Sequence, residues 1–222
     1  MNFSDFDKLA DEIRSCQATL VAVSKTRPAS ELMPFIQHGQ LDFGENYVQE
    51  LIEKHEAVKQ QVNWHFIGHL QRNKVKQIVP FVYLIQGVDS LKLLTEIGAQ
   101  SVKCEKTTPV LLQVHIADEE TKFGVSPDEI SSWVDTFGAQ PIPGVEIRGL
   151  MGMATLTGNE QQITAEFKGL RKLFDAVKNS VKGKQGFDFN ILSMGMTSDY
   201  RIALAEGSTM VRIGSAIFGS RG

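Results

Sequence analysis

The sequence predicts an α/β fold: a single (β/α)8 barrel of the TIM type with a leading N-terminal helix. About eight apolar stretches with strand character alternate in regular order with stretches whose apolar residues recur at helical spacing. The 222 residues suit one such barrel, because α/β barrels run to about 200 to 250 residues as a single unit. We therefore expect one domain over residues 1–222. A doubly wound open sheet is the alternative, but eight regular units favour closure.

The leading helix is predicted over residues 3–15. Phe3, Phe6, Leu9 and Ile13 form an apolar stripe there, with acidic residues between them. This spacing places the apolar side chains on one face of a helix. We expect that face to pack against the barrel.

The strands are predicted from apolar runs that lack polar alternation, as parallel strands buried on both faces do. We expect them at 19–26, 41–46, 63–70, 83–88, 109–116, 145–153, 189–195 and 209–219. Helices are expected between them, at 28–37, 48–61, 71–82, 89–104, 126–139, 160–182 and 199–207. Pro80 interrupts the third of these helices, whereas Ser126, Pro127 and Glu129 give the fifth a strong start.

Composition and charge exclude several classes of function. Acidic residues outnumber basic ones by 26 to 23, and no block of lysine and arginine stands out, so we expect no nucleic-acid partner. The N-terminal stretch lacks the basic-then-apolar order of a signal peptide, and no apolar run approaches the roughly 20 residues of a membrane span. We expect a cytoplasmic protein. Cys16 and Cys104 have no metal-ligand spacing, so we expect packing residues and neither a disulfide nor a metal site.

A single lysine ends the first predicted strand. The stretch TLVAVSKT is apolar up to Ser24 and Lys25, and a charge at the end of a buried strand is unusual as packing. An ammonium held among apolar side chains loses hydration, its pKa falls, and the neutral amine can attack a carbonyl. The position alone favours a lysine that has left the barrel and extends into water. The far end of the chain changes this interpretation.

Hydroxyl and glycine residues end the last two predicted strands, in SMGMTSD and RIGS. Barrels of this kind frequently bind a phosphate in the loops after strands seven and eight, where backbone N–H groups point at the anion. Ser193, Thr197, Gly214 and Ser215 suit that role, although either stretch alone equally suits a tight turn or an N-cap. Together with Lys25 they describe a site for a phosphate-bearing aldehyde, and pyridoxal 5′-phosphate (PLP) fits that description.

Six motifs spread over nearly the whole chain carry a resemblance: VAVSKTRPAS, FGENYVQE, WHFIGHLQRNK, RGLM, SMGMTSDY and GSTMVRIGSAIFG. By these motifs the chain resembles the YggS/PROSC family of PLP-binding proteins, the PLP homeostasis proteins. The resemblance implies a barrel like the N-terminal domain of alanine racemase, with PLP held as a Schiff base on Lys25. It also implies a role in keeping PLP and related B6 vitamers in balance.

The resemblance assigns the phosphate to two segments. Ser193 and Thr197 match the two hydroxyl positions of the family's S-x-G-M-S stretch, and Gly214 with Ser215 matches the loop that completes the phosphate cup. Thr197 departs from the commoner serine, which keeps the hydroxyl and adds a methyl group. The loop GMATLTG after RGLM also departs from the small and proline-rich loops of some relatives.

The resemblance assigns the ring of the cofactor to Arg212, which matches the arginine facing the pyridine nitrogen, while Asn46 matches a residue near the cofactor. A guanidinium stays charged and only donates hydrogen bonds, so the ring nitrogen should remain unprotonated. The cofactor is then a poorer electron sink than in enzymes that pair this nitrogen with an aspartate. Without the motif, a salt bridge from Arg212 to Glu206 or Asp199 explains the arginine equally well.

Three histidines in or near strands are further candidates. His69 stands where some relatives have proline, and His115 where many have asparagine. A histidine inside a strand is more often a hydrogen-bonded core residue than a catalyst, and we favour that interpretation for His65, His69 and His115.

Three classes of function fit a barrel with this site. The first is a carrier that stores or delivers PLP, with apo-enzymes as recipients, and the second is a PLP-dependent racemase. A two-base racemase of the alanine type takes its second base from a C-terminal β-domain of a partner subunit, and this sequence stops at Gly222 after the last predicted strand. We therefore expect a carrier without robust turnover. As a separate expectation, we take the protein to be a monomer. A metal-dependent or phosphosugar enzyme is the third class.

Overall fold

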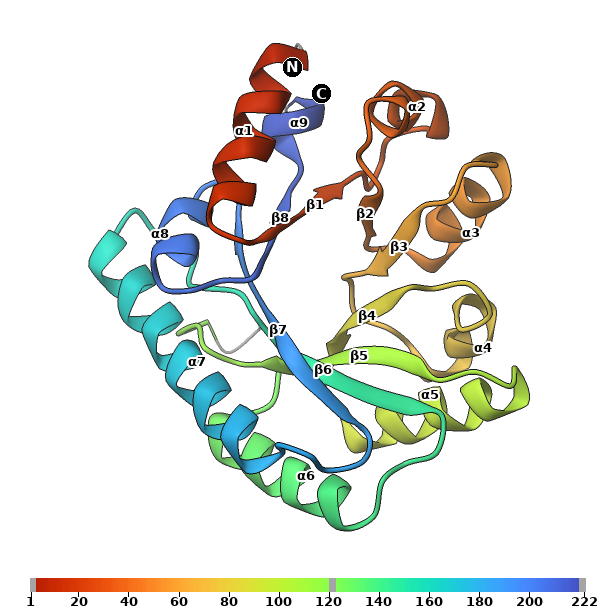
Figure 1. Cartoon of the computed structure of the whole chain (residues 1–222), viewed down its shortest axis with the longest axis vertical. Coiled ribbons are helices and arrows are strands. Elements are labelled where there is room, and N and C mark those ends of the chain that lie inside the picture. Colours follow the sequence, from red (N-terminus) through yellow and green to blue (C-terminus); the bar gives the residue numbers. More distant parts are fainter. Residues whose placement is uncertain (1–2, 120–122, 220–222) are drawn as a thin grey trace.

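A computed structural model describes residues 3–119 and 123–219. The eight described strands pair in chain order, each parallel to its neighbours, and β8 pairs with β1. This closed barrel, surrounded by helices as Figure 1 shows, confirms the predicted fold. The open doubly wound sheet is excluded because an open sheet has two unpaired edge strands and this one has none.

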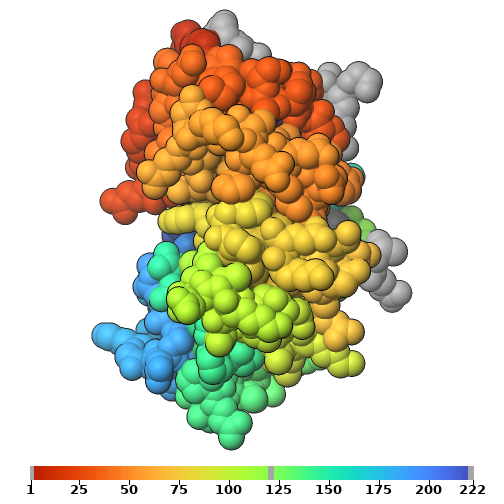
Figure 2. Space-filling view, turned by 90° about the vertical axis from the view of Figure 1, so that its right-hand side faces the viewer, coloured from red at the N-terminus to blue at the C-terminus, as the bar shows by residue number. Residues whose placement is uncertain are grey.

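The strands are β1 (Thr19–Val23), β2 (Asp42–Glu45), β3 (Asn63–Phe66), β4 (Leu84–Val88), β5 (Thr108–Val114), β6 (Val145–Gly152), β7 (Phe187–Met196) and β8 (Met210–Ile213). The helices are α1 (Phe3–Ser15), α2 (Ala29–Gln37), α3 (Val48–Ala57), η1 (Arg72–Lys74), α4 (Val75–Ile78), α5 (Leu91–Lys103), α6 (Pro127–Ala139), α7 (Glu160–Ser180), α8 (Tyr200–Ala205) and α9 (Ser215–Phe218). Figure 2 shows one face, where the orange, yellow and green segments follow one another in chain order.

Local sequence signals explain several boundaries. The predicted capping box is present at α6, where the Ser126 side chain accepts a hydrogen bond from the Glu129 N–H and the Glu129 carboxylate accepts one from the Ser126 N–H. The helix α4 ends at Ile78, two residues ahead of Pro80, whose ring nitrogen has no hydrogen to donate to a further helical hydrogen bond. These signals act within a few residues, so the sequence alone exposes them.

The last predicted strand was too long. The strand β8 ends at Ile213, and the residues SAIF that follow form the short helix α9. Gly214 lies between them with φ −120° and ψ −71°, so the chain leaves the extended conformation there. Ile217 is nevertheless fully buried, and an apolar residue at that position is typical of a strand as much as of a helix.

Two apolar clusters form the core. The larger one lies between the strands and the surrounding helices and includes the buried face of α1 at Phe6, Leu9 and Ile13, as predicted. The smaller one lies inside the barrel and consists of Val21, Leu84, Leu111, Met151 and Met210. Barrels of this kind fill their interior with side chains, so they have no open pore.

The cysteine prediction was wrong in one respect. Cys16 and Cys104 are free thiols, but both are exposed and neither packs in the core. Each follows the last residue of a helix, α1 and α5, where the chain lies on the surface. Within residues 3–119 and 123–219, no helix combines the length and apolar character that a membrane crossing requires.

Candidate functional site

A cavity of about 230 Å³ opens at the carboxyl ends of the strands. It is lined by Val23, Lys25, Thr26, Arg27, Asn46, Ile67, Met153, Met196, Thr197, Arg212, Gly214, Ser215, Phe218 and Gly219. Six of the seven predicted site residues are in this set, and they come from the ends of β1, β2, β7 and β8. Barrel closure brings these ends together around one space, the face on which barrels of this type carry their sites.

Lys25 lies two residues beyond β1, in a turn, and is half-buried. The next residue, Thr26, has a φ of 66°. A β-branched residue in this left-handed region is rare and strained. Such a conformation persists only where the surroundings hold it.

A buried ion pair between Glu45 and Lys54 holds the turn that carries Lys25. The Ser24 hydroxyl donates to Glu45 Oε1 at 2.5 Å, and the Thr26 N–H donates to Glu50 Oε2 at 2.7 Å. Lys54 Nζ lies 2.6 Å from Glu45 Oε1 and donates to the Ser24 carbonyl at 2.7 Å. Both neighbours of the site lysine are therefore tied to β2 and α3.

Glu45 is fully buried, and Lys54 is 5% exposed. Burial raises the pKa of the Glu45 carboxyl above its usual 4.5, and Lys54 and Ser24 offset part of that rise. This ion pair was not predicted from the sequence. The signals that could have revealed it are the acidic residue ending a buried strand and the spacing of Glu50 and Lys54, which are four apart on one helix.

Thr197, Gly214 and Ser215 lie together at the other side of the cavity. The Gly214 N–H donates to the Thr197 hydroxyl at 3.4 Å, which joins the loops after β7 and β8. A Cβ at Gly214 would lie 3.1 Å from the Val23 carbonyl oxygen, so glycine allows β1 and this loop to approach closely. The resulting cradle offers hydroxyl groups and backbone to a small anion.

Ser193 does not lie where it was predicted. Ser193 is fully buried inside the barrel. Its hydroxyl donates to Gln86 Oε1 at 2.7 Å and accepts from Arg212 Nη1 at 2.5 Å. The hydroxyl is thus turned toward these two side chains, and we assign it no direct contact with a ligand in the cavity. Ser193 lies three residues before the end of β7, too deep in the barrel to reach the rim.

Arg212 is buried at the bottom of the cavity. Its second nitrogen donates to the Gly152 carbonyl at 3.1 Å, so the acceptors of these two hydrogen bonds, a hydroxyl and a carbonyl, are both neutral. Burial lowers the pKa of Arg212 to about 10, and the charge of Asp199 opposes that fall. The guanidinium still carries its proton at neutral pH. The hydrogen bonds of Arg212 go to Ser193 and to the Gly152 carbonyl, so a salt bridge at the rim of the barrel does not explain the position of this arginine.

Asn46 contributes a side-chain oxygen without a hydrogen-bond partner to the cavity wall. Its side-chain Oδ1 is buried and makes no hydrogen bond. Buried polar atoms are nearly always hydrogen-bonded, so an exception in a cavity wall indicates a place for a ligand. The loop after β3 packs closely behind it, because a Cβ at Gly68 would lie 2.2 Å from the Asn46 carbonyl oxygen.

The charge of the cavity is positive. Among the described lining residues, Lys25, Arg27 and Arg212 are basic and none is acidic. An amine at one side, a hydroxyl-rich cradle at another and a guanidinium at the bottom suit an anionic aldehyde with a flat ring. The residues present therefore fit PLP.

None of the three candidate histidines, His65, His69 and His115, lines this cavity. His69 is exposed, and its Nδ1 lies 3.1 Å from Asp89 Oδ2 while its ring stacks on Phe123 at 4.2 Å. His115 lines a separate cavity of about 280 Å³ beside α7. In the part of the chain that the structure describes, no three His, Cys, Asp or Glu residues are grouped as a metal site.

The fold and the cavity define the class of protein: a TIM-type barrel with a basic small-molecule site at the carboxyl ends of its strands. Over residues 3–222 the sequence matches the family described as alanine racemase, N-terminal domain. The chain belongs to this family and, within it, to the YggS/PROSC family of pyridoxal phosphate homeostasis proteins. The pyridoxal phosphate homeostasis protein of Haemophilus influenzae is 38% identical over 205 residues, which cover 91% of this chain and 84% of that protein.

Solved structures agree with this family. PipY of Synechococcus elongatus, solved without PLP, superposes with a TM-score of 0.89 at 30% identity and covers 97% of this chain and 99% of its own. The same protein with PLP bound gives a TM-score of 0.87 at 29% identity, with the same coverage. Alanine racemase of Clostridium difficile is 13% identical with a TM-score of 0.76, covering 100% of this chain and 57% of that one, a likeness of fold alone.

Proposed function

We propose that this chain binds PLP in the cavity and forms a Schiff base between Lys25 Nζ and the aldehyde carbon. Two findings support the proposal: the relatives are named pyridoxal phosphate homeostasis proteins, and PipY has been solved with PLP bound. Thr197 with the backbone of Gly214 and Ser215 would hold the phosphate, and Arg212 would face the ring nitrogen. When bound, PLP supplies an aldehyde that traps amines and a ring that withdraws electrons.

The observation that carries the proposal is the placement of Lys25 against the cradle of Thr197, Gly214 and Ser215 in one cavity. The amine follows β1, whereas the phosphate-binding groups follow β7 and β8, as a ligand with an aldehyde and a phosphate at separate positions requires. The turn carrying Lys25 is held by the Glu45–Lys54 ion pair. A lysine whose backbone is already held in place loses less conformational freedom when it reacts than one on a loose segment does.

We further propose that the protein is a cytoplasmic, monomeric, one-domain carrier that contributes to B6 balance by storing PLP or delivering it to apo-enzymes. The cavity supports a carrier more than a racemase. Among its described lining residues, Lys25 is the sole amine, and the guanidinium groups of Arg27 and Arg212 donate hydrogen bonds and do not accept a proton. A two-base racemase needs a second acid or base on the opposite face of its substrate.

Borohydride reduction of the PLP-loaded protein, followed by peptide mass spectrometry, tests the proposal. The reduced pyridoxyl group is expected on Lys25. The variant Lys25→Ala should bind no covalent label, whereas Lys59→Ala, which removes an exposed lysine beyond α3, should be labelled like the parent. Label on Lys74 or Lys122 in the parent protein, or no label at all, would overturn the assignment.

A further inference from the structure

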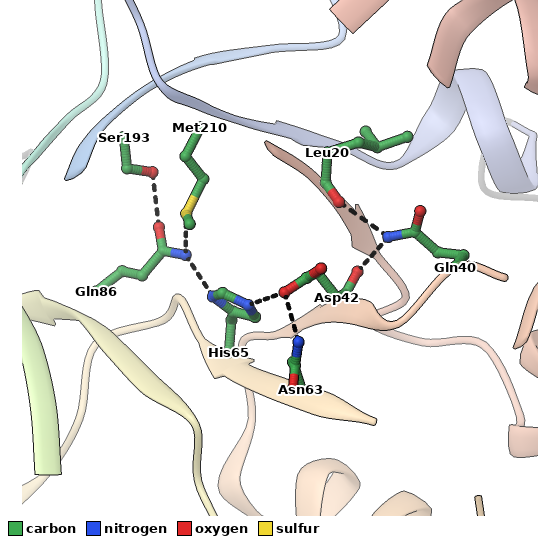
Figure 3. Close-up of polar contacts among 8 residues, drawn as sticks. All are labelled: Leu20, Gln40, Asp42, Asn63, His65, Gln86, Ser193 and Met210. Carbon is green, nitrogen blue, oxygen red and sulfur yellow. Dashed lines mark hydrogen bonds and ion pairs between the residues drawn. The ribbon is translucent and has the colours of Figure 1, made fainter. Parts of the chain in front are cut away.

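A chain of hydrogen bonds crosses the barrel interior from the cavity toward the opposite end; Figure 3 draws its course from Ser193 onward. Arg212 Nη1 donates to Ser193 Oγ at 2.5 Å, and Ser193 Oγ donates to Gln86 Oε1 at 2.7 Å. Gln86 Nε2 lies 3.0 Å from His65 Nδ1, and His65 Nε2 lies 3.0 Å from Asp42 Oδ1. We call these five residues the relay.

The relay exists only because the barrel is closed. Ser193 lies on β7 and Gln86 on β4, which are not neighbours, so their hydrogen bond spans the interior. Asp42 is the first residue of β2, at the end of the barrel away from the cavity, and its side chain is 23% exposed. Between these ends His65, Gln86 and Ser193 are fully buried. Polar groups at such depth are costly unless each is hydrogen-bonded.

The direction of each hydrogen bond follows from the one before it. A carboxylate only accepts, so His65 Nε2 carries the hydrogen that faces Asp42, and in the neutral ring Nδ1 accepts. The Gln86 amide must then turn its NH2 group toward His65, which points its carbonyl oxygen at Ser193. The Ser193 hydroxyl donates to that oxygen, and its own lone pair is left for Arg212. One carboxylate thus orders every donor along the relay.

Asp42 is itself held in place. Asn63 Nδ2 donates to its Oδ1 at 3.1 Å, and Gln40 Nε2 bridges the Asp42 carbonyl at 2.7 Å and the Leu20 carbonyl at 2.8 Å, as Figure 3 shows. Gln86 Nε2 has a second contact at 3.2 Å to the sulfur of Met210. The relay therefore starts from an anchored end, and side-chain networks of this kind fix a single arrangement when every member is satisfied.

We propose that His65 and Gln86 are positioning residues that hold Arg212 through Ser193 and so give the cavity its preference for a ring with a nitrogen acceptor. An arginine has five N–H donors, and two are taken by Ser193 and the Gly152 carbonyl. With the guanidinium fixed by these two bonds, a remaining N–H is aimed at the ring nitrogen of a ligand. The inference rests on the proposed binding of PLP.

The test compares two ligands that differ at the ring nitrogen. The dissociation constants of PLP and of 1-deaza-PLP, which has a carbon in place of that nitrogen, are measured for the full-length protein. PLP should bind the parent more tightly by about tenfold or more, the value of one hydrogen bond to a charged group. In Gln86→Leu and His65→Leu this preference should fall to about threefold or less, while the affinity for 1-deaza-PLP stays within about twofold of the parent.

A matched control is available on the neighbouring strand. Gln113 on β5 is also a buried glutamine, but its amide donates to the Phe123 carbonyl at 2.8 Å and is not part of the relay. The variant Gln113→Leu should keep the full preference for PLP. A loss of preference in this variant as large as in Gln86→Leu would attribute the effect to core damage and overturn the relay.

The outcomes separate the relay from the proposed function. No binding of either ligand by the parent would refute the proposed function itself. Equal binding of both ligands by the parent would refute the role of Arg212, whereas an unchanged preference in Gln86→Leu and His65→Leu would refute the relay alone.

Nitrogen-15 NMR of the histidine rings in the parent protein provides a second test that needs no variant to fold. His65 should carry hydrogen on Nε2, which faces Asp42, and none on Nδ1, which faces the Gln86 amide nitrogen, in the unloaded and the PLP-loaded protein alike. Hydrogen on Nδ1 would reverse the hydrogen bond to Gln86 and contradict the relay.

Discussion

Ser193 and Thr197 are alike in the sequence, since both are hydroxyl residues of one short motif, but their surroundings differ. Thr197 lines the cavity and accepts a hydrogen bond from the Gly214 N–H. Ser193 is buried below it against Gln86 and Arg212. A side chain near the phosphate affects a phosphorylated ligand selectively, whereas one that holds Arg212 affects every ligand with the same ring.

We therefore expect Thr197→Val to weaken binding of PLP far more than binding of unphosphorylated pyridoxal. The lost hydrogen bond to a charged phosphate corresponds to about 1.5 to 3 kcal/mol, or tenfold or more in affinity. Ser193→Ala serves as the comparison and should weaken both vitamers by similar factors. Binding titrations of the two vitamers check this, and equal weakening by Thr197→Val would argue against its place in the phosphate cradle.

Glu45 gives the protein a distinctive pH dependence. Burial raises the pKa of this carboxyl in the folded state above 4.5, the value expected in the unfolded chain. Between the raised pKa and 4.5 the folded protein holds a proton that the unfolded chain has released. The contribution of Glu45 to the free energy of unfolding is thus fully present below the unfolded pKa and is lost as the pH rises through the folded pKa.

The variant Glu45→Gln cannot take up this proton. The loss of unfolding free energy that it causes should therefore be larger at about pH 5 than at about pH 7. Urea unfolding of the parent and the variant at both pH values measures the difference. A loss that is smaller at the lower pH would mean that the ion pair with Lys54 dominates and that the pKa of Glu45 is lowered.

At the scale of elements, the turn after β1 depends on α3. Lys54 on this helix contacts Glu45 on β2 and the carbonyl of Ser24 beside the site lysine. Removing one member of a buried ion pair leaves the other charge without compensation, which is strongly destabilising. The buried pair therefore holds strand, helix and turn in one arrangement.

We expect Lys54→Met to lower the free energy of unfolding by about 3 kcal/mol and to speed the release of PLP, because the turn loses its support. The double variant Glu45→Gln/Lys54→Met should recover part of that stability, since no buried charge is then left unpaired. Lys59→Met, which changes an exposed lysine, is the control and should have little effect. Denaturant unfolding and stopped-flow release measure both quantities. A loss in Lys54→Met no larger than in Lys59→Met would show that the pair does not support the turn.

At the scale of the whole molecule, barrel closure places one base beside one cavity. Under the proposed function, Lys25 would take a proton from one face of a bound amino acid, whereas the guanidinium groups of the two lining arginines only donate hydrogen bonds. Tyr200 and Tyr83 are engaged elsewhere, with Glu12 and against His65. Proton exchange needs one base, but inversion needs a second group on the opposite face.

The PLP-loaded protein should therefore exchange the α-proton of L-alanine slowly, if at all, and should not invert it at an enzyme-like rate. Incubation in deuterated water, with isotope content and chirality followed together, separates the two processes. Inversion on the order of 1 per second or faster would favour the racemase over the carrier.

The sequence by itself determined the order of the elements and the residues at the strand ends. Apolar periodicity and capping signals act over a few residues. The sequence therefore predicted the alternation of strands and helices, the start of α6 and the position of Lys25 after β1. Parallel strands present their carboxyl ends on one face, which is why Lys25, Thr197 and Gly214 could be expected to meet.

Only the tertiary structure decided what lies at depth. Whether a strand residue reaches the rim or the interior depends on the stagger of the closed barrel, so Ser193 joined the relay although Thr197, four residues on, reached the cavity. His65 and Gln86 lie on adjacent strands, but Ser193 follows Gln86 by 107 residues. Their hydrogen bonds form across a barrel interior that exists only after closure, and no local pattern in the chain records them.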